Sequence, residues 1–485
     1  MLLWLTLACE TGATDSAGSV SPDVTLHAAP AFDPGSDTPL TWTVTGDDAE
    51  PGAAGTIVDS AGAVVRKRVA SAAGWDGRTD DGALAPTGAY TLRVGAGESA
   101  PSHPFQLVRA GLTAAWAEDD GGTTATRVAL YWAQKRHIQD VAAAFSQVGG
   151  IDAADGTATA LPALGDDLTY PTEGTTEPLA YPYDSRPIVT VQLGAESAWG
   201  PPNLDAVPLD VAAAGWSVLE GSPATDGGTV TLQRDAPLGS TVGVTEEVLT
   251  LEVTTTDDEG VVWPVQSMQV PLRVYRLLDT PTWDAEGERY SPWVAAVDPA
   301  LRALEGTLPT RDAVLDALVR WVFEDEGLEY DTRYGASAYT VYQGNDWERA
   351  NFNMGAYLAR KYGVVVNCTD CAGIMVGYGN MLGARVEYAI IGMNFDLNYI
   401  LAIGGDEFTH CPFGGSGCGF SYHAVSVSSE SDLIWDATLA LDGDDDPGAA
   451  PHEELLVQAI DADEYLERLA KTRTDYIAQA QGGLQ

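Results

Sequence analysis

Positively charged side chains are scarce in this sequence. Its 485 residues include 25 Lys and Arg against 70 Asp and Glu, which gives a formal net charge of −45. Nucleic acids and anionic membrane surfaces would repel such a chain, so neither is an expected partner. Hydrophobic residues make up 45% of the sequence, enough to fill cores, so the acidic residues indicate a solvated surface and not a disordered acidic chain.

Long apolar runs are also lacking, since no stretch reaches the ~18 residues of a membrane-spanning helix. Residues 1–8 are mostly apolar, and Cys9 follows Ala8 ahead of a polar segment that extends to residue 22. This pattern resembles the end of a bacterial lipoprotein signal, which implies lipidation of Cys9. We therefore expect an extracytoplasmic protein, either anchored to a bacterial membrane through Cys9 alone or secreted.

Cysteines are few, and four of the five lie in the last quarter of the chain, at 368, 371, 411 and 418. Outside the cytoplasm, the short Gly-rich segment between Cys411 and Cys418 could close as a disulfide. Such a bridge would brace the segment that leads into His423.

Short apolar runs alternate with Gly-, Asp- and Pro-rich turns through the first part of the chain, a pattern typical of β-sandwiches. A chain of this length is expected to hold about three domains. We predict one sandwich at 23–110 and one or two more at 111–280, with a helix candidate at 139–147. Motifs at 75–82 and 85–94 resemble the Ig-like module of flagellar hook-capping proteins, a resemblance that extends over about 23–108 and implies a spacer or docking role.

A helical period begins in the last third of the chain. Helices are predicted at 312–325, 347–362 and 368–383. Strands are predicted at 385–391, 399–403, 421–428 and 433–436. We therefore expect a linker at 281–300, an α+β domain at 301–441, and an acidic loop with a C-terminal helix at 442–485. The fold class is thus multidomain, with all-β modules followed by an α+β domain.

One cysteine, one histidine and one aspartate of this domain form a candidate nucleophilic site. Cys368 opens a predicted helix, where the dipole and the unpaired N–H groups favour a thiolate and can face an oxyanion. His423 lies 55 residues later on the apolar face of a strand, and Asp436 lies 13 residues further on the next strand. A buried imidazole needs a partner, so Asp436 is predicted to hold His423 as a general base toward Cys368.

The motifs around these residues resemble the transglutaminase-like (papain-type cysteine) superfamily over about 300–440. The shared features are Cys368 with Asp370 and Ala372, Leu-Gly-Ala-Arg at 382–385, His-Ala at 423–424, and Trp-Asp-Ala-Thr at 435–438. The resemblance implies a nucleophilic Cys368, a basic His423 and an orienting Asp436. It also implies a thioester acyl-enzyme formed on protein or peptide amides, without a cofactor or a metal.

The sequence departs from the family pattern at three places. Val366-Asn367 precedes the cysteine where Gly-x is usual, Cys371 replaces an aromatic residue, and Val425 stands where Trp is common. These changes affect expected substrate contacts more than the three site residues. The family includes inactive relatives, so a cell-surface binding or structural protein with an inactive domain is the alternative function.

Two other interpretations of the cysteines remain open. Cys368 and Cys371 have the spacing of a zinc half-site or a redox pair, and Cys411, Cys418, His410 and His423 could complete a zinc site. Alternatively, both helix cysteines and His423 are ordinary buried core residues. Cys371 lies nearly a turn further into the predicted helix, so it is expected to be a packing residue.

Overall fold

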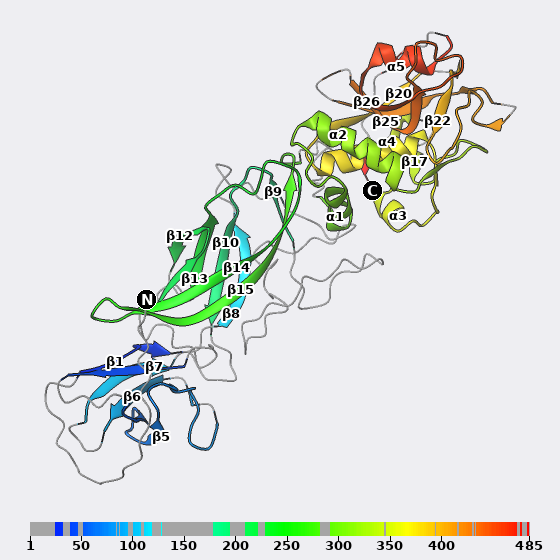
Figure 1. The fold of residues 1–485 in the computed structure, drawn as a ribbon. Helices are drawn as coiled ribbons and strands as arrows, with labels where there is room; N and C mark the ends of the chain where they lie inside the picture. The colour runs from blue at the N-terminus through cyan, green and yellow to red at the C-terminus, as the bar shows by residue number, and fades with distance from the viewer. Residues whose placement is uncertain are drawn as a thin grey trace.

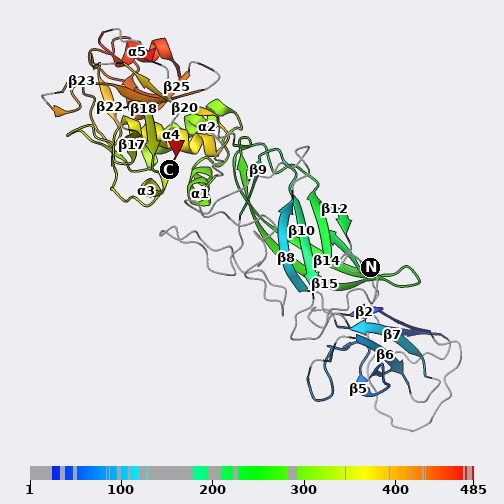
Figure 2. The ribbon, with the colours of Figure 1, turned by 180° about the vertical axis from the view of Figure 1, so that it is seen from behind.

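The computed structural model describes residues 25–118, Val128, 178–281 and 292–484, apart from gaps within these ranges. The gaps are 33–38, 47–51, 84, 87, 96–99, 108–110, 195–208, 222–227, 344–345, 393, 415–416, 429–430, 432, 473–475 and 478–482. Cys9 and the predicted helix at 139–147 lie outside the described residues. The chain forms three parts in succession: a small β module, a curved sheet, and a mixed domain that carries the helices (Figure 1, and from behind in Figure 2).

The first module is a sandwich of two small sheets. One pairs β1 with β3, and the other has the order β2-β7-β6-β4-β5. Alternate residues of β6 point inward, and Tyr90 among them packs with Phe105 around the fully buried Trp75. This alternation is what one buried face requires. The strands are β1 (Thr25–Ala28), β2 (Ala31–Phe32), β3 (Trp42–Thr45), β4 (Gly55–Asp59), β5 (Val64–Val69), β6 (Gly88–Val94) and β7 (Ser102–Leu107).

The second part is one continuous sheet of the order β8-β10-β13-β12-β11-β14-β15-β9. All the strands described between 111 and 277 belong to it, so the described residues of this region form one sheet. Its long hairpin β14–β15 is curved in Figure 1 and lines a single apolar core. The strands are β8 (Gly111–Glu118), β9 (Leu179–Pro182), β10 (Ile188–Gly194), β11 (Leu209–Ala213), β12 (Trp216–Gly221), β13 (Thr229–Arg234), β14 (Gly243–Thr256) and β15 (Val262–Leu277).

The curved sheet and the last domain share a hydrophobic core. Tyr275 and Leu277, at the end of β15, belong to the same buried cluster as the apolar face of α1 (Val294–Ala303). Arg302 of α1 also pairs with Glu246 of β14 at 3.0 Å. Helix α1 begins inside the segment 281–300, which was predicted to be a linker. The last seven residues of that segment, 294–300, are therefore helical.

A close backbone contact adds to this junction. Gly383 follows α4 (Cys368–Met381) with φ 87°, and a Cβ there would lie 2.5 Å from the carbonyl oxygen of Asp279. The amide of Leu278 donates to the carbonyl of Leu382 at 3.0 Å. Only glycine permits both the left-handed turn and this approach.

The last domain places α4 against a sheet of the order β22-β25-β24-β20-β27, with β26 paired to β25. Its helices are α1, α2 (Arg311–Arg320), the π-helical turn η4 (Trp321–Asp325), α3 (Met354–Leu358), α4 and α5 (Ala462–Leu469). Its strands are β16 (Glu329–Tyr330), β17 (Thr340–Gln343), β18 (Asp346–Phe352), β19 (Val365–Val366), β20 (Val386–Ile391), β21 (Phe395–Asp396), β22 (Ile400–Ala402), β23 (Gly419–Phe420), β24 (His423–Ser428), β25 (Leu433–Asp442), β26 (Glu454–Asp461), β27 (Tyr476–Ile477) and β28 (Gly483–Leu484).

Two predicted helices differ from the structure. The first half of 347–362 is strand β18, which pairs with β17, and α3 begins only after Asn353, whose side chain accepts from the amide of Ala356 at 2.9 Å. Among the described residues of 442–485 the one helix is α5, and β26 precedes it. No helix among the described residues is both long and apolar enough to cross a membrane.

Candidate active site

Helix α4 sets the position of Cys368, because Cys368 is its first residue. The N-cap Asn367 accepts from the amide of Asp370 at 3.1 Å, and the Asp370 side chain accepts from the Asn367 amide at 3.4 Å. This reciprocal pair is a capping box, which fixes where a helix begins. The Cys368 thiol therefore lies at the positive end of the helix dipole, with only 5% of the residue exposed.

Asp370 also ties a distant segment to the start of α4. Its carboxylate accepts from the amides of Ala338 and Tyr339, at 2.6 and 3.0 Å, and from the Thr340 hydroxyl at 2.8 Å. Burial raises the pKa of Asp370, against the opposing effect of these hydrogen bonds. The segment 338–340 is therefore fixed beside the start of α4 by one buried carboxylate.

His423 begins β24 and is fully buried. Its Nε2 lies 2.8 Å from Oδ2 of Asp436, which stands on the adjacent strand β25. The other ring nitrogen, Nδ1, is buried without a partner of normal hydrogen-bond geometry among the described residues. The Asp436 contact thus leaves Nδ1 as the nitrogen available to the thiol.

Cys368 is close enough to act on this imidazole. Burial lowers the pKa of His423, but the charges of Asp436 and then of Cys368 outweigh burial and raise the pKa to about 10. The ring therefore carries a proton at neutral pH, between a carboxylate on one side and the sulfur on the other. A protonated ring held between these two groups is one requirement of a cysteine–histidine site.

Aromatic side chains form a wall on one side of the imidazole. Phe420 stacks on His423 with ring centroids 5.1 Å apart and planes 8° apart, and Phe413 packs on Phe420 at 5.9 Å. Tyr330 contacts both phenylalanines, and burial, followed by the charge of Cys368, raises its pKa. None of these three residues was predicted as part of the site. Tyr330 belongs to β16, Phe420 to β23, and Phe413 to the loop between Cys411 and Cys418. No local sequence pattern connects these three positions.

The structure separates the two cysteines of the 368–371 motif. Cys371 is fully buried, and burial raises the pKa of its thiol well above the usual value. It is free, as is Cys368, so the two do not form a disulfide. A neutral buried thiol is a packing residue, which agrees with the interpretation of Cys371 from the sequence.

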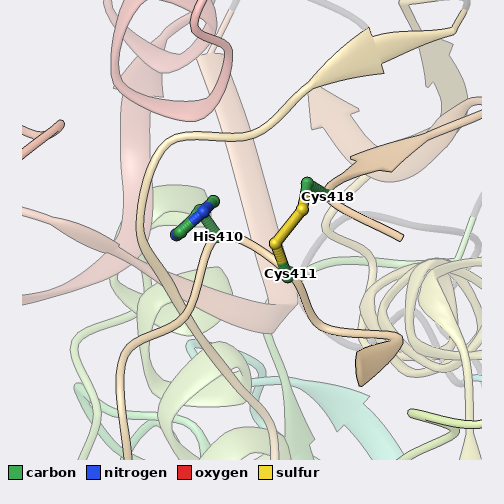
Figure 3. A group of neighbouring side chains, drawn as sticks. All are labelled: His410, Cys411 and Cys418. Carbon is green, nitrogen blue, oxygen red and sulfur yellow. A yellow bond between two sulfur atoms is a disulfide. The ribbon is translucent and has the colours of Figure 1, made fainter. Parts of the chain in front are cut away.

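Cys411 and Cys418 form a disulfide that closes the loop carrying Phe413. Within the described residues, His410, Cys411 and Cys418 are the one group of three potential metal ligands whose donor atoms lie within 4.8 Å of one another (Figure 3). Two of those three donor atoms, the sulfurs of Cys411 and Cys418, are bonded to each other in the disulfide. Cys368, Cys371 and His423 are not part of that group, so the geometry does not assemble the zinc set considered from the sequence.

The similarity of this chain to known proteins is partial. No family model matches the sequence, and no curated protein matches it significantly. Among solved structures, red sea bream transglutaminase is similar over 54% of this chain and 49% of its own, with 12% identity and a TM-score of 0.27. BcpA, the major pilin subunit of Bacillus cereus, is similar over 52% of this chain and 69% of its own, with 11% identity and a TM-score of 0.14. The chain spans about half the length of that transglutaminase, and these scores carry no argument about chemistry.

Proposed function

We propose that this protein is a transglutaminase-like cysteine acyltransferase or hydrolase that acts on amide bonds of proteins or peptides. The observation that carries the proposal is the His423–Asp436 contact of 2.8 Å, which leaves Nδ1 free of Asp436 while Cys368, at the start of α4, raises the pKa of the same ring. The sequence motifs that resemble the superfamily surround the same three residues.

In the proposed reaction, the Cys368 thiolate attacks the amide carbonyl carbon and forms the carbon–sulfur bond of a tetrahedral intermediate. The first N–H groups of α4 stabilise its oxyanion. When the carbon–nitrogen bond breaks, the His423 imidazolium gives its proton to the leaving amine, and a thioester remains on Cys368. His423, now neutral, takes a proton from water or an acceptor amine as that group attacks the thioester. The second tetrahedral intermediate then collapses, the carbon–sulfur bond breaks, and the acid or new amide leaves with the Cys368 thiolate restored beside the imidazolium. Asp436 stays ionised and orients the ring throughout.

The test is capture of the thioester. A glutamine-containing peptide is incubated with the full chain, acid-quenched, and analysed by mass spectrometry while released ammonia is measured. We expect an acyl adduct on the peptide that contains Cys368, no adduct in Cys368→Ala, and ammonia release that follows the adduct. Ammonia release retained in Cys368→Ala would contradict the proposal.

The low exposure of Cys368 favours one other candidate function, a surface binding or structural protein whose last domain is inactive. A site only 5% exposed at the cysteine must open before any amide can reach the sulfur. An inactive domain predicts no adduct at any peptide concentration, together with unchanged stability and binding in Cys368→Ala. The capture experiment therefore decides between the two functions.

We also propose an extracytoplasmic location, with the protein anchored by lipid at Cys9 or secreted. The Cys411–Cys418 disulfide supports an oxidising compartment, and the acidic surface disfavours direct contact with anionic lipid. Detergent phase partitioning of the wild type and of Cys9→Ser tests the anchor. A lipoprotein moves from the detergent phase to the aqueous phase on that substitution, and equal partitioning would argue against lipidation.

A further inference from the structure

Helix α5 reaches the candidate active site from the far C-terminal end of the domain. It packs against β25 and β26, and Tyr465 and Leu469 are its buried residues. Asp461 caps it by accepting from the amide of Asp463 at 2.9 Å, so the helix starts at a fixed point of the chain. Tyr465 lies on the inner side of this helix and is completely buried.

The Tyr465 hydroxyl donates a hydrogen bond to Oδ2 of Asp436 at 2.8 Å. The same oxygen lies 2.8 Å from Nε2 of His423. The other oxygen, Oδ1, accepts from the amide of Thr438 at 2.7 Å. The carboxylate is therefore held at both oxygens, and it cannot rotate about its Cβ–Cγ bond without breaking at least two of these contacts.

We propose that Tyr465 is a positioning residue of the acyl-transfer site, which fixes the carboxylate of Asp436 and through it the ring of His423; this rests on the proposed function. The hydroxyl does not reach the reacting atoms. It keeps Oδ2 directed at Nε2 while the ring gives up a proton and takes one back. The C-terminal helix is in this way a part of the site, although the three main site residues all precede it in sequence.

Electrostatics fit this role. Burial raises the pKa of Tyr465 well above the usual value, and the negative charge of Asp436 raises it further, so the hydroxyl stays a donor across the working pH range. A hydrogen bond to a buried carboxylate is stronger than one between neutral groups. By drawing charge from Oδ2, it also limits how strongly Asp436 holds the imidazolium. Among the described residues, the titratable groups that interact with this cluster include Cys368 and Cys371 of α4, Asp436 of β25 and Tyr330 of β16.

The deciding variant is Tyr465→Phe, which removes one oxygen and keeps the ring. The matched control is Tyr357→Phe, because Tyr357 is also buried in this domain and its hydroxyl also donates to a carboxylate, that of Glu326. Glu326 has no part in the candidate site. Any general loss from removing a buried tyrosine hydroxyl should therefore appear in both variants.

Three quantities are measured on the full chain: kcat and KM for ammonia release from a glutamine peptide, and the pKa of the His423 ring from its titration by NMR. We expect Tyr465→Phe to lower kcat about tenfold with KM unchanged, since a hydrogen bond to a charged group is lost. We also expect the His423 titration to move up by about half a pH unit, because more negative charge remains on Oδ2. Tyr357→Phe should change neither.

A Tyr465→Phe protein with the kcat and the His423 titration of the wild type would overturn the inference. So would equal changes in Tyr357→Phe, because they would show a structural role only. If the wild type releases no ammonia, the proposed function fails, whereas the NMR titration still decides whether Tyr465 acts on His423 through Asp436.

Discussion

The start of α4 and the loop at 411–418 each carry two cysteines, and the structure treats them in opposite ways. Cys368 and Cys371 are three residues apart and both free, whereas Cys411 and Cys418 are seven apart and bonded. The closer pair is held by a helix that directs the two side chains to different surroundings. The wider pair lies on a Gly-rich loop that can bring its ends together.

This difference shows that spacing alone does not assign a cysteine its role. Cys368 is at the helix start and acts on the His423 ring, while Cys371 is buried one turn further on and stays neutral. Local environment, and above all charge and burial, separates a reactive thiol from a packing residue. The loop pair closes the segment that carries Phe413, which packs on Phe420, and Phe420 in turn stacks on the imidazole.

The largest expected effect contrasts the two helix cysteines. Cys368→Ala should reduce ammonia release from a glutamine peptide by about 1000-fold or more, because the nucleophile is gone. Cys371→Ala should keep turnover within about tenfold of the wild type and lose stability instead, because it leaves a small cavity. Steady-state rates and urea unfolding measure both. Equal losses of turnover in the two variants would remove the distinction.

The second prediction concerns the charge that Cys368 helps to hold on His423. The pKa of His423 is raised to about 10 in the folded protein, against ~6.5 when unfolded. The stability that the imidazolium contributes is therefore complete below about pH 6.5 and is lost as pH rises through about 10. The difference in unfolding free energy between the wild type and His423→Gln should shrink over that window, as measured by urea denaturation.

Asp436→Asn provides the control for this pH dependence, because Asp436 is the largest of the charges that raise the His423 pKa. With that charge removed, stability should change less with pH over the same window. A difference between wild type and His423→Gln that stays constant from about pH 6.5 to about pH 10.5 would count against the charged imidazole.

The third prediction concerns Asp370, which lies between the two helix cysteines. Asp370→Ala should lower the free energy of unfolding by about 3 kcal/mol, because it removes the capping box and leaves the donors of 338–340 unpaired. Asp370→Asn should lose less, since one acceptor oxygen remains. The exposed Asp445→Ala should change stability by under about 0.5 kcal/mol. A loss as small as that in Asp370→Ala would contradict this role.

The smallest expected effect belongs to the loop pair. Cys411→Ser with Cys418→Ser should lower the free energy of unfolding by about 2 kcal/mol, because the disulfide closes only a short loop of the unfolded chain. A thiol reductant should destabilise the wild type by the same amount and leave the double variant unchanged. A reductant effect on the double variant would point to some other target.

The sequence predicted the parts of the site that depend on local pattern. The helix at Cys368 and the strands bearing His423 and Asp436 follow from a helix start and from apolar alternation, and the structure places the two strands side by side. Tyr465 and Phe420 were missed, because their contacts with Asp436 and His423 arise only on folding. A C-terminal helix was predicted, but without any link between it and the site.

The fold was likewise predicted where it depends on local sequence pattern and missed where it depends on contacts formed on folding. The sandwich at 23–110 and the α+β domain follow from period and turn residues. Strand β18 was expected to be helix. That prediction was wrong because the pairing of β18 with β17 overrides a weak local preference for helix. The shared core between the curved sheet and α1 could not be read from the sequence, because both faces are simply apolar until they meet.

The most direct measurement of the central claim is competitive alkylation of the folded protein by iodoacetamide, with the labelled cysteines quantified by mass spectrometry. Cys368 should label much faster than Cys371, and His423→Ala should abolish that preference, because the imidazolium that holds the thiolate is lost. Equal and slow labelling of both cysteines in the wild type would contradict the account.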